Sequence, residues 1–205
     1  MLNEYISESS RFGTSPLILL LNGPAGSGKD TIANAMSSFN HAKFATPLYE
    51  CLRSLFRISP NDWLDIYTNH KNEPTEKLGG MSPRQAMIWM SEDVCKPKLG
   101  SPFFGEMLAK RIEAVVAAGR NGDRFVVSDS GFTEEAMVLV ETYGAESVKL
   151  VNLHRYGHDY KNDSRNYING IDLGVDTAHV SNVGSVETVT QLILDWCFTG
   201  LEIQQ

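Results

Sequence analysis

The sequence contains little cysteine: only Cys51, Cys95 and Cys197 occur among its 205 residues. The three are far apart, odd in number, and include no Cys-x-x-Cys pair. This pattern excludes a disulfide framework and a zinc site built from paired cysteines. We therefore expect a protein of a reducing compartment.

An excess of positive charge is also absent. The chain has 18 lysines and arginines against 25 acidic residues, which gives a formal net charge of -7. This balance argues against generic binding to nucleic acid or to an anionic membrane. Any polyanionic ligand must instead be met by local arginines.

Long hydrophobic runs are missing as well. No apolar run approaches the roughly 20 residues that cross a bilayer. The start, Met1 to Ser10, is polar and acidic and lacks the basic and apolar regions of a signal peptide. The apolar fraction of 42% still allows a substantial core. We expect a cytoplasmic protein of one compact domain, with or without a small insertion.

The most informative stretch is Leu17–Ala33. Five apolar residues at its start predict a strand buried on both faces, and a glycine-rich turn and a helix follow. Glycine permits backbone angles that turn successive N–H groups inward, and the helix start near Lys29 adds unpaired N–H groups and the positive dipole end. This concavity predicts a phosphate site, with Lys29 placed to reach the outer phosphates of a nucleoside triphosphate. The expected nucleotide contacts are Gly23, Ala25, Gly26, Ser27, Gly28, Lys29, Asp30 and Thr31.

The spacing from Gly23 to Lys29 is the P-loop pattern, and one residue departs from it. Asp30 stands where a magnesium-binding serine or threonine is usual. A carboxylate is also a hard oxygen ligand, so Asp30 is a candidate for Mg²⁺, although its charge repels phosphate unless a cation lies between them. The hydroxyl of Thr31 is placed to meet an inner phosphate. The alternative is a glycine-rich turn that only joins a strand to a helix.

Strands and helices alternate along the rest of the chain. Strands are expected at 17–21, 43–45, 125–128 and 148–153, and helices at 28 to about 39, from 47, from 60, from 83, and at 102–118, 134–143 and 185–198. The stretches 68–80 and 154–174 are polar and are expected to be loops. This alternation predicts an α/β fold with a parallel, doubly wound sheet.

Asp129 ends the strand 125–128, at the edge where open α/β sheets keep their ligands. A carboxylate there, together with a P-loop, suits a magnesium–water shell, so Asp129 is the second candidate metal residue. The alternative is an aspartate that only caps the helix starting near Thr133.

Five arginines are placed to handle phosphate. Arg53, Arg57 and Arg84 lie between the first helix and the second core strand, where a phosphate acceptor would be held, and planar guanidinium groups grip phosphate oxygens in pairs. Arg155 and Arg165 lie in the polar stretch after a core strand, which is the place of a closing lid. The alternative for each is a solvated surface position. Trp63, Tyr67 and Trp89 are candidates for base stacking, with core packing the alternative.

Four pieces together resemble the bacteriophage deoxynucleoside monophosphate kinases, within the P-loop nucleoside monophosphate kinases. They are Gly23–Thr31 with aspartate after lysine, Phe44-Ala45-Thr46-Pro47-Leu48, Lys71 to Asp93 with Ser82-Pro83-Arg84-Gln85, and Val127-Ser128-Asp129-Ser130-Gly131-Phe132 followed by Glu135. The resemblance spans most of residues 17–195. It implies a P-loop three-layer core at about 16–45 and 103–205, a helical acceptor-binding insertion at about 46–102, and a short lid at about 154–174.

The resemblance also implies a reaction. ATP and Mg²⁺ would serve as cofactors, and a deoxynucleoside monophosphate would accept the terminal phosphoryl group, in a monomer or homodimer. Arg84 would hold the acceptor phosphate with Lys71 in the same segment, Arg155 or Arg165 would act from the lid, and Asn182 would lie in the turn near the adenine. Many relatives have arginine at the position of Gly131, so a phosphate-gripping residue is either missing here or supplied from elsewhere.

Two other functions stay open at the level of sequence. One is a dephospho-coenzyme A kinase or another small-molecule kinase, whose hydroxyl acceptor needs a base that Asp129 would provide. The other is a non-catalytic protein that uses ATP as a switch.

Overall fold

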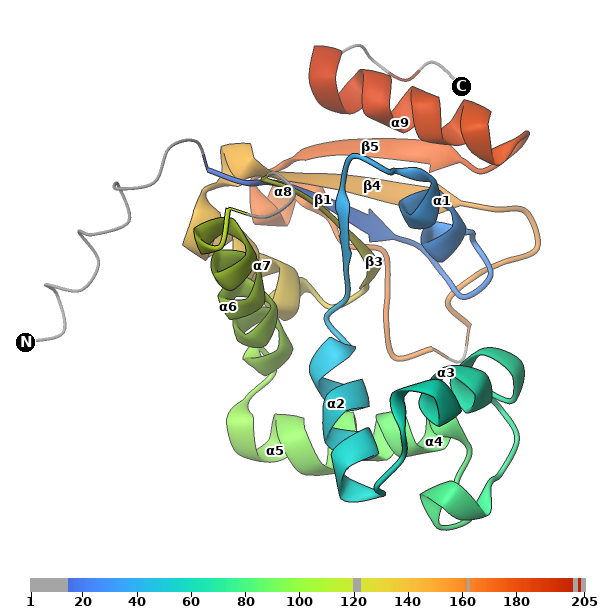
Figure 1. The fold of residues 1–205 in the computed structure, drawn as a ribbon. Helices are drawn as coiled ribbons and strands as arrows, with labels where there is room; N and C mark the ends of the chain where they lie inside the picture. Colours follow the sequence, from blue (N-terminus) through green and yellow to red (C-terminus); the bar gives the residue numbers. More distant parts are fainter. Residues whose placement is uncertain (1–14, 120–122, 162, 201–202, 204–205) are drawn as a thin grey trace, which may run out of the picture.

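The computed structural model describes residues 15–119, 123–161, 163–200 and 203 (Figure 1). Five strands form one parallel sheet in the order β2-β3-β1-β4-β5. They are β1 (Leu17–Asn22), β2 (Asn40–Ala42), β3 (Arg124–Ser130), β4 (Val148–His154) and β5 (Asp176–Ser181). The predicted parallel α/β fold is confirmed.

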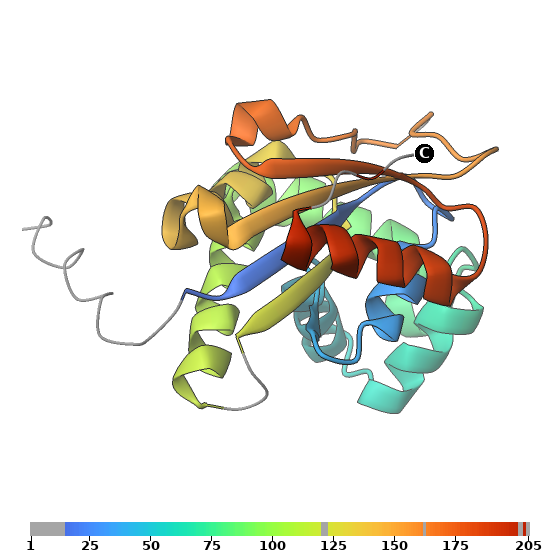
Figure 2. The same ribbon diagram turned by 90° about the horizontal axis from the view of Figure 1, so that it is seen from above.

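Helices cover both faces of this sheet, which gives three layers (Figures 1 and 2). One face carries α1 (Lys29–Ala35) and α9 (Val186–Thr199), and the other carries α6 (Phe103–Ala117), α7 (Thr133–Tyr143) and α8 (Gly170–Leu173). The central strand β1 divides its side chains between the two cores. Leu19 and Leu21 pack with α1 and α9, whereas Ile18 and Leu20 pack with α6 and α7, and all four are fully buried. Burial on both faces is the reason why β1 is a continuous apolar run.

A helical insertion connects β2 to α6 and lies beside the three layers (Figure 1). It contains α2 (Thr46–Leu55), α3 (Pro60–Asn69), a 3₁₀ turn (Glu76–Leu78), α4 (Pro83–Ile88), a π-helical segment (Trp89–Cys95) and α5 (Lys96–Leu99). Serine caps and a following proline start two of these helices. Ser59 accepts a hydrogen bond from the Asp62 amide, and Ser82 and Gln85 form a complete capping box around the start of α4.

Two expected boundaries around β2 are wrong. The strand spans Asn40–Ala42 and not 43–45, because the amides of Phe44 and Ala45 donate to the Asp129 carboxylate and not to a neighbouring strand. The helix α1 ends at Ala35 and not near 39, because Met36 leaves the helical conformation and starts a tight turn.

The sequence did not predict β5. This strand pairs with β4 at the edge of the sheet, and only Ala178 and Val180 are buried in it. Its other four residues are polar or exposed, so it lacks the apolar run that marked the inner strands. An edge strand with one covered face needs no more than this alternation.

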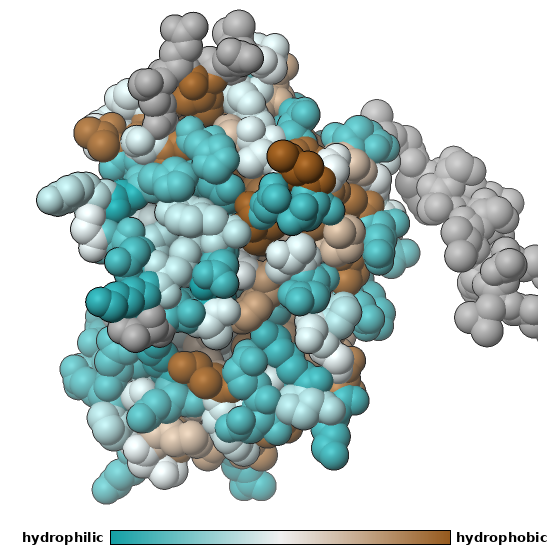
Figure 3. All heavy atoms as spheres, turned by 180° about the vertical axis from the view of Figure 1, so that it is seen from behind, coloured by the Kyte–Doolittle hydropathy of each residue, from teal (hydrophilic) through white to brown (hydrophobic). Residues whose placement is uncertain are grey.

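Large hydrophobic side chains are exposed at several places on the described surface, for example Leu64, Ile171 and Val183. The side seen in Figure 3 is mostly hydrophilic, with separate hydrophobic patches. Within the ranges described above, no helix combines the length and apolarity required to span a membrane.

Candidate active site

The turn between β1 and α1 has the backbone shape of a phosphate loop. Gly26 and Gly28 adopt φ angles of 80° and 99°, which side-chain-bearing residues rarely adopt. Asn182 closes the loop from the other side, since its Nδ2 donates to the Ser27 carbonyl at 2.7 Å and sits where a Cβ of residue 28 would stand. The turn is therefore fixed by contacts on both sides, and Asn182 supports the loop directly.

Lys29 folds back over this turn. Its ammonium donates to the carbonyls of Gly23 and Pro24 and to Ser27 Oγ, and the residue is only 8% exposed. Burial, together with the nearby Arg165 charge, lowers the pKa of Lys29 to about 8. The three hydrogen-bond partners of this ammonium are uncharged oxygens, so Lys29 is a candidate to bind an anion such as phosphate at the loop.

Asp30 is held by a network that the sequence did not reveal. Its Oδ1 accepts from Lys43 Nζ and from Ser128 Oγ, both at 2.6 Å, and His41 Nε2 lies 2.7 Å from the same serine hydroxyl. Partial burial would raise the pKa of Asp30, but the hydrogen bonds from Lys43 and Ser128 outweigh it and lower the pKa. Lys43 thus supplies the positive charge that keeps a carboxylate tolerable beside a phosphate site.

Asp129 lies at the end of β3 and lines one cavity together with Lys29 and Asp30. Its two oxygens accept the amides of Phe44 and Ala45 at 2.9 and 3.0 Å. Burial raises the pKa of Asp129, and these amide hydrogen bonds oppose the shift. The helix α7 that follows has no side-chain cap. The aspartate therefore anchors the entry to the helical insertion, and each oxygen keeps lone pairs for a further ligand.

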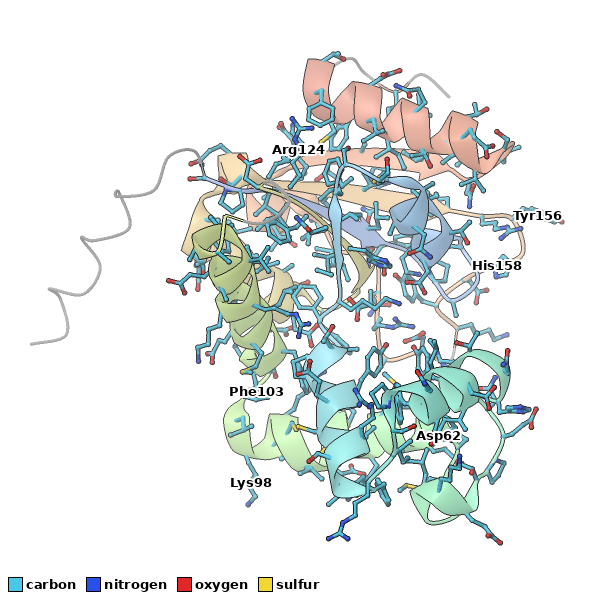
Figure 4. All side chains as sticks on the ribbon, viewed as in Figure 1. Asp62, Lys98, Phe103, Arg124, Tyr156 and His158 are labelled. Atoms are coloured by element: carbon cyan, nitrogen blue, oxygen red, sulfur yellow. The ribbon has the colours of Figure 1, made fainter. Side chains whose placement is uncertain are left out.

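The segment after β4 contacts the phosphate loop. Arg155 donates to the Gly26 carbonyl at 3.0 Å, and His158 Nδ1 lies 2.9 Å from the Ala25 carbonyl. Figure 4 shows His158 beside the turn between β1 and α1, while Tyr156 points away into solvent. The far end of the segment is fixed to the sheet, because Asn22 bonds the backbone of Asn166 and Ile168.

Arg165 occupies the space above Gly131. A Cβ added at Gly131 would lie 2.6 to 2.8 Å from Cδ, Cβ and Cγ of Arg165, which no real side chain tolerates. The Arg165 guanidinium is aimed by two hydrogen bonds to Asp163, at 2.9 and 2.7 Å. Glycine at 131 therefore makes room for an arginine that arrives from the segment after β4.

One cavity of about 740 Å³ unites these groups. Its walls come from the phosphate loop, the β3 end, the helical insertion and the segment after β4. Of the residues predicted as site residues, it is lined by Ala25, Gly26, Gly28, Lys29, Asp30, Thr31, Lys71, Arg84, Asp129, Arg155 and Arg165. Gly23, Ser27 and Asn182 are not among the lining residues. Gly23 and Ser27 accept hydrogen bonds from Lys29, and Asn182 donates one to the Ser27 carbonyl.

Four predicted acceptor-side residues lie elsewhere. Arg53 and Arg57 are on or just after α2 and are not among the cavity-lining residues, nor is Trp89. Trp63 is buried in the insertion, where it stacks on Tyr67 with ring centroids 6.0 Å apart. Of the three predicted stacking candidates only Tyr67 is among the cavity-lining residues, which also include the aromatic residues Tyr49, Phe104 and Phe132.

Several cavity residues escaped the sequence reasoning. The clearest are Lys43, Ser128, Glu135 and Asp163. His158, which contacts the Ala25 carbonyl of the phosphate loop, was missed as well. Lys43 and Ser128 lie next to predicted motifs, and a lysine and a hydroxyl near the ends of neighbouring strands would have been a usable signal. His158 and Asp163 lie in a polar stretch without periodicity, where nothing in the pattern separates them from solvent-facing neighbours.

The donor set fits a nucleotide with Mg²⁺. Asp30 has a side chain that is 63% exposed, and Asp129 shares its cavity, so two carboxylates are available to the ion or its water shell. No cluster of three or more metal-ligating side chains occurs in the described ranges. Mg²⁺ is commonly bound by one or two carboxylates plus water and phosphate oxygens, which Asp30 and Asp129 could provide in part.

No protein-family model matches the sequence, and no curated protein matches it either. Among solved structures, an unliganded sugar kinase from Janibacter sp. HTCC2649 is 14% identical, with a TM-score of 0.46 and coverage of 93% of this chain and 100% of that chain. A gluconokinase from Sinorhizobium meliloti 1021 is 15% identical, with a TM-score of 0.40 and coverage of 86% and 88%. A dephospho-CoA kinase from Campylobacter jejuni is 14% identical, with a TM-score of 0.39 and coverage of 90% and 98%. None of the three is a bacteriophage deoxynucleoside monophosphate kinase, so that resemblance stays a prediction.

Proposed function

We propose that this protein is a deoxynucleoside monophosphate kinase. In the proposed reaction the bond between the γ-phosphorus of ATP and its bridging oxygen breaks, and a new bond forms to a phosphate oxygen of the acceptor. The products are ADP and a deoxynucleoside diphosphate. The observation that carries the proposal is the shared cavity, in which a phosphate loop faces Arg84 and Lys71 of the helical insertion.

Phosphoryl transfer to such an acceptor requires the protein to align the two substrates and to neutralise their charge. The acceptor phosphate is already an anionic nucleophile, so no side-chain base is needed. Lys29 and the loop amides would hold the ATP phosphates, Arg84 the acceptor phosphate, and Arg155 and Arg165 the charge that develops during transfer. Mg²⁺, bound through Asp30 and Asp129, would neutralise phosphate charge. Lys43 would hold Asp30 in place.

A hydroxyl acceptor, as in a dephospho-CoA kinase, would need Asp129 as a base. Both oxygens of Asp129 already accept backbone N–H groups. Burial raises the pKa of Asp129 and these hydrogen bonds oppose the rise only in part, so the preference for a phosphate acceptor rests on Arg84 and Lys71 at the cavity wall.

The test is an ADP-release assay with ATP, Mg²⁺ and a panel of ribo- and deoxyribonucleoside monophosphates. We expect strong stimulation by one or a few deoxynucleotides. Stimulation by dephospho-coenzyme A or a sugar alone would assign a different acceptor to the same site. ATP binding without stimulation by any acceptor would point to an ATP-dependent switch.

A further inference from the structure

Glu135 is a buried carboxyl for which the proposed transfer of phosphate has no use. It lies in the first turn of α7, its side chain is 5% exposed, and it lines the cavity. Within the described residues its carboxyl makes no hydrogen bond, and the nearest cation, Lys96 Nζ, is 3.9 Å away. Because this carboxyl lines the cavity, a ligand bound there is placed to supply a hydrogen-bond partner.

Lys96 makes its shorter contacts with residues other than Glu135. Its ammonium lies 2.9 Å from Glu92 Oε1 and 3.4 Å from the centroid of the Phe132 ring. These contacts fix Glu92, Phe132 and Glu135 around one point, and all three line the cavity. We call Glu92, Phe132 and Glu135 the acidic wall, because contacts with Lys96 hold the three side chains together at one part of the cavity surface.

The acidic wall is unsuited to phosphate. Glu92 is already paired with Lys96 and Glu135 is buried, so the wall offers phosphate no free cation. Two of the cavity's arginines instead act on Asp163, which is hydrogen-bonded by Arg165 and has its pKa lowered by Arg165 and, less strongly, by Arg84. The cavity therefore has an anion-binding part and an acidic part. A ligand that fills both carries phosphate on one side and an uncharged group with hydrogen-bond donors on the other.

Apolar and aromatic side chains of the same cavity suit a flat ring. Leu48, Met87 and Phe104 line the same cavity as Phe132 and give it apolar and aromatic surface. Pockets of this kind bind planar heterocycles through their faces and use a few polar groups to read their edges. Burial raises the pKa of Glu135 to about 8, so near neutrality its carboxyl offers a donor beside an acceptor.

We propose that Glu135 hydrogen-bonds the edge of the acceptor's nucleobase and contributes to the choice among bases. This inference rests on the proposed function, because it takes the acceptor to be a nucleoside monophosphate. The carboxyl would accept from an amino or imino N–H of the base, with the ring held between the apolar side chains. Glu135 is then a specificity residue that takes no part in phosphoryl transfer.

The experiment compares two ligands that differ only in the base. Dissociation constants are measured calorimetrically for the best deoxynucleoside monophosphate and for 2-deoxyribose 5-phosphate, with wild-type protein and with Glu135→Met. The variant keeps the side-chain length but removes both oxygens. We expect nucleotide binding to weaken about tenfold or more, the loss of one hydrogen bond to a charged or buried group. Binding of the sugar phosphate should not change.

Glu134→Gln is the matched control, because Glu134 is the exposed neighbour in the same helix. It should leave both constants unchanged. Glu135→Gln provides a second variant of nearly identical shape, and it should change the ratio of affinities among the four bases. The KM for ATP should stay the same in all variants.

Equal weakening of both ligands by Glu135→Met, or unchanged base ratios in Glu135→Gln, would overturn the inference. The proposed function survives either result, provided that wild-type protein still phosphorylates the nucleotide. If wild-type protein binds and phosphorylates no nucleoside monophosphate, the proposed function has failed first and the inference falls with it.

Discussion

At the scale of single residues, the site is a set of charges that hold one another in place. Lys43 and Asp30 are joined at 2.6 Å, and Arg165 and Asp163 at 2.7 Å. Lys29 has only uncharged loop oxygens as hydrogen-bond partners. It is the cation best placed to exchange its present contacts for a bound phosphate.

Lys29→Ala should remove turnover while leaving the fold intact. The lysine is expected to stabilise charge on the transferred phosphoryl group, and losing one such donor costs about 100-fold or more in kcat. Its present hydrogen bonds are to carbonyls at the cavity edge, which water can replace. ADP release and a thermal melt of the purified variant measure the two effects. A variant with near-normal kcat would contradict the proposed role.

Glu135 should make the stability of the protein depend on pH. Its pKa is about 8 in the folded chain because burial disfavours the charged form, Lys96 opposes that shift, and Asp129, Glu92 and Glu134 add to it. The folded state therefore holds a proton between pH 4.5 and 8 that the unfolded state releases. The contribution of Glu135 to the free energy of unfolding is largest below its pKa in the unfolded chain, which is about 4.5. This contribution is lost as the pH rises through about 8, its pKa in the folded chain.

Urea unfolding of wild-type protein and Glu135→Gln at pH 5, 6, 7 and 8 measures this effect. The stability of wild-type protein relative to the variant should fall steadily over that range, by on the order of a few kcal/mol in total. A constant difference would mean that Glu135 is ionised throughout. The exposed Glu134→Gln provides the reference for nonspecific charge effects.

At the scale of elements, the helical insertion and the segment after β4 bring arginines to the sheet by different means. Arg84 is in the first turn of α4, whose start is fixed by the capping box of Ser82 and Gln85. Arg165 lies in an irregular segment and is fixed by Asp163 and by the space above Gly131. Each arrangement predicts a different consequence of mutation.

Ser82→Ala should cost about 1 kcal/mol of stability and raise the KM for the acceptor. The cap orients α4, so its loss moves Arg84. Ser59→Ala is the control, since Ser59 caps α3 in the same way but α3 carries no cavity arginine. Both variants should lose similar stability in urea unfolding, and only Ser82→Ala should change the acceptor KM. A KM change of equal size in both would mean that general loosening is responsible.

Gly131→Ala should reproduce the kinetic defect of Arg165→Ala. The added methyl group meets the Arg165 side chain at under 3 Å, so the arginine must leave its place. We expect kcat to fall about tenfold to 100-fold in either single variant, with little further loss in the double variant, because both act through one side chain. Steady-state kinetics of the three proteins test this. Losses that multiply in the double variant would show independent effects.

At the scale of the whole molecule, the cavity lies between the three-layer core and the helical insertion. Its wall includes residues of the phosphate loop, α2 to α4, α7 and the segment after β4. A ligand that fills the cavity would contact both the three-layer core and the helical insertion. Binding should therefore stabilise the molecule as a unit.

A bisubstrate analogue, with adenosine and a deoxynucleoside joined through five phosphates, should raise the melting temperature more than ATP does. At a free concentration of about 100 times its Kd, a ligand adds about 2.7 kcal/mol. At equal free concentrations the tighter ligand therefore adds more stability. Differential scanning fluorimetry at equal free concentrations of the two ligands, with hydrogen exchange on α2 and α4, gives the measurement. Protection confined to the phosphate loop would show that the insertion does not take part in binding.

The sequence by itself determined the parts that depend on near neighbours. The buried strand, the glycine turn and Lys29 lie within Leu17–Ala33, and the caps of α3 and α4 follow from residues three apart. Hydrophobic periodicity also predicted the parallel sheet and most of its helices, because burial on one or both faces leaves a local pattern. The edge strand β5 was missed since its burial is slight.

Only the tertiary structure decided which distant residues meet. Ser128 reaches Asp30 across 98 positions, Asn22 reaches Asn166 across 144, and Arg165 fills the space over Gly131. The strand order and the path of the segment after β4 set these contacts, and neither leaves a short-range pattern. The physical reason is that a charge or hydroxyl is equally stable facing solvent or a partner until the fold has removed the water around it.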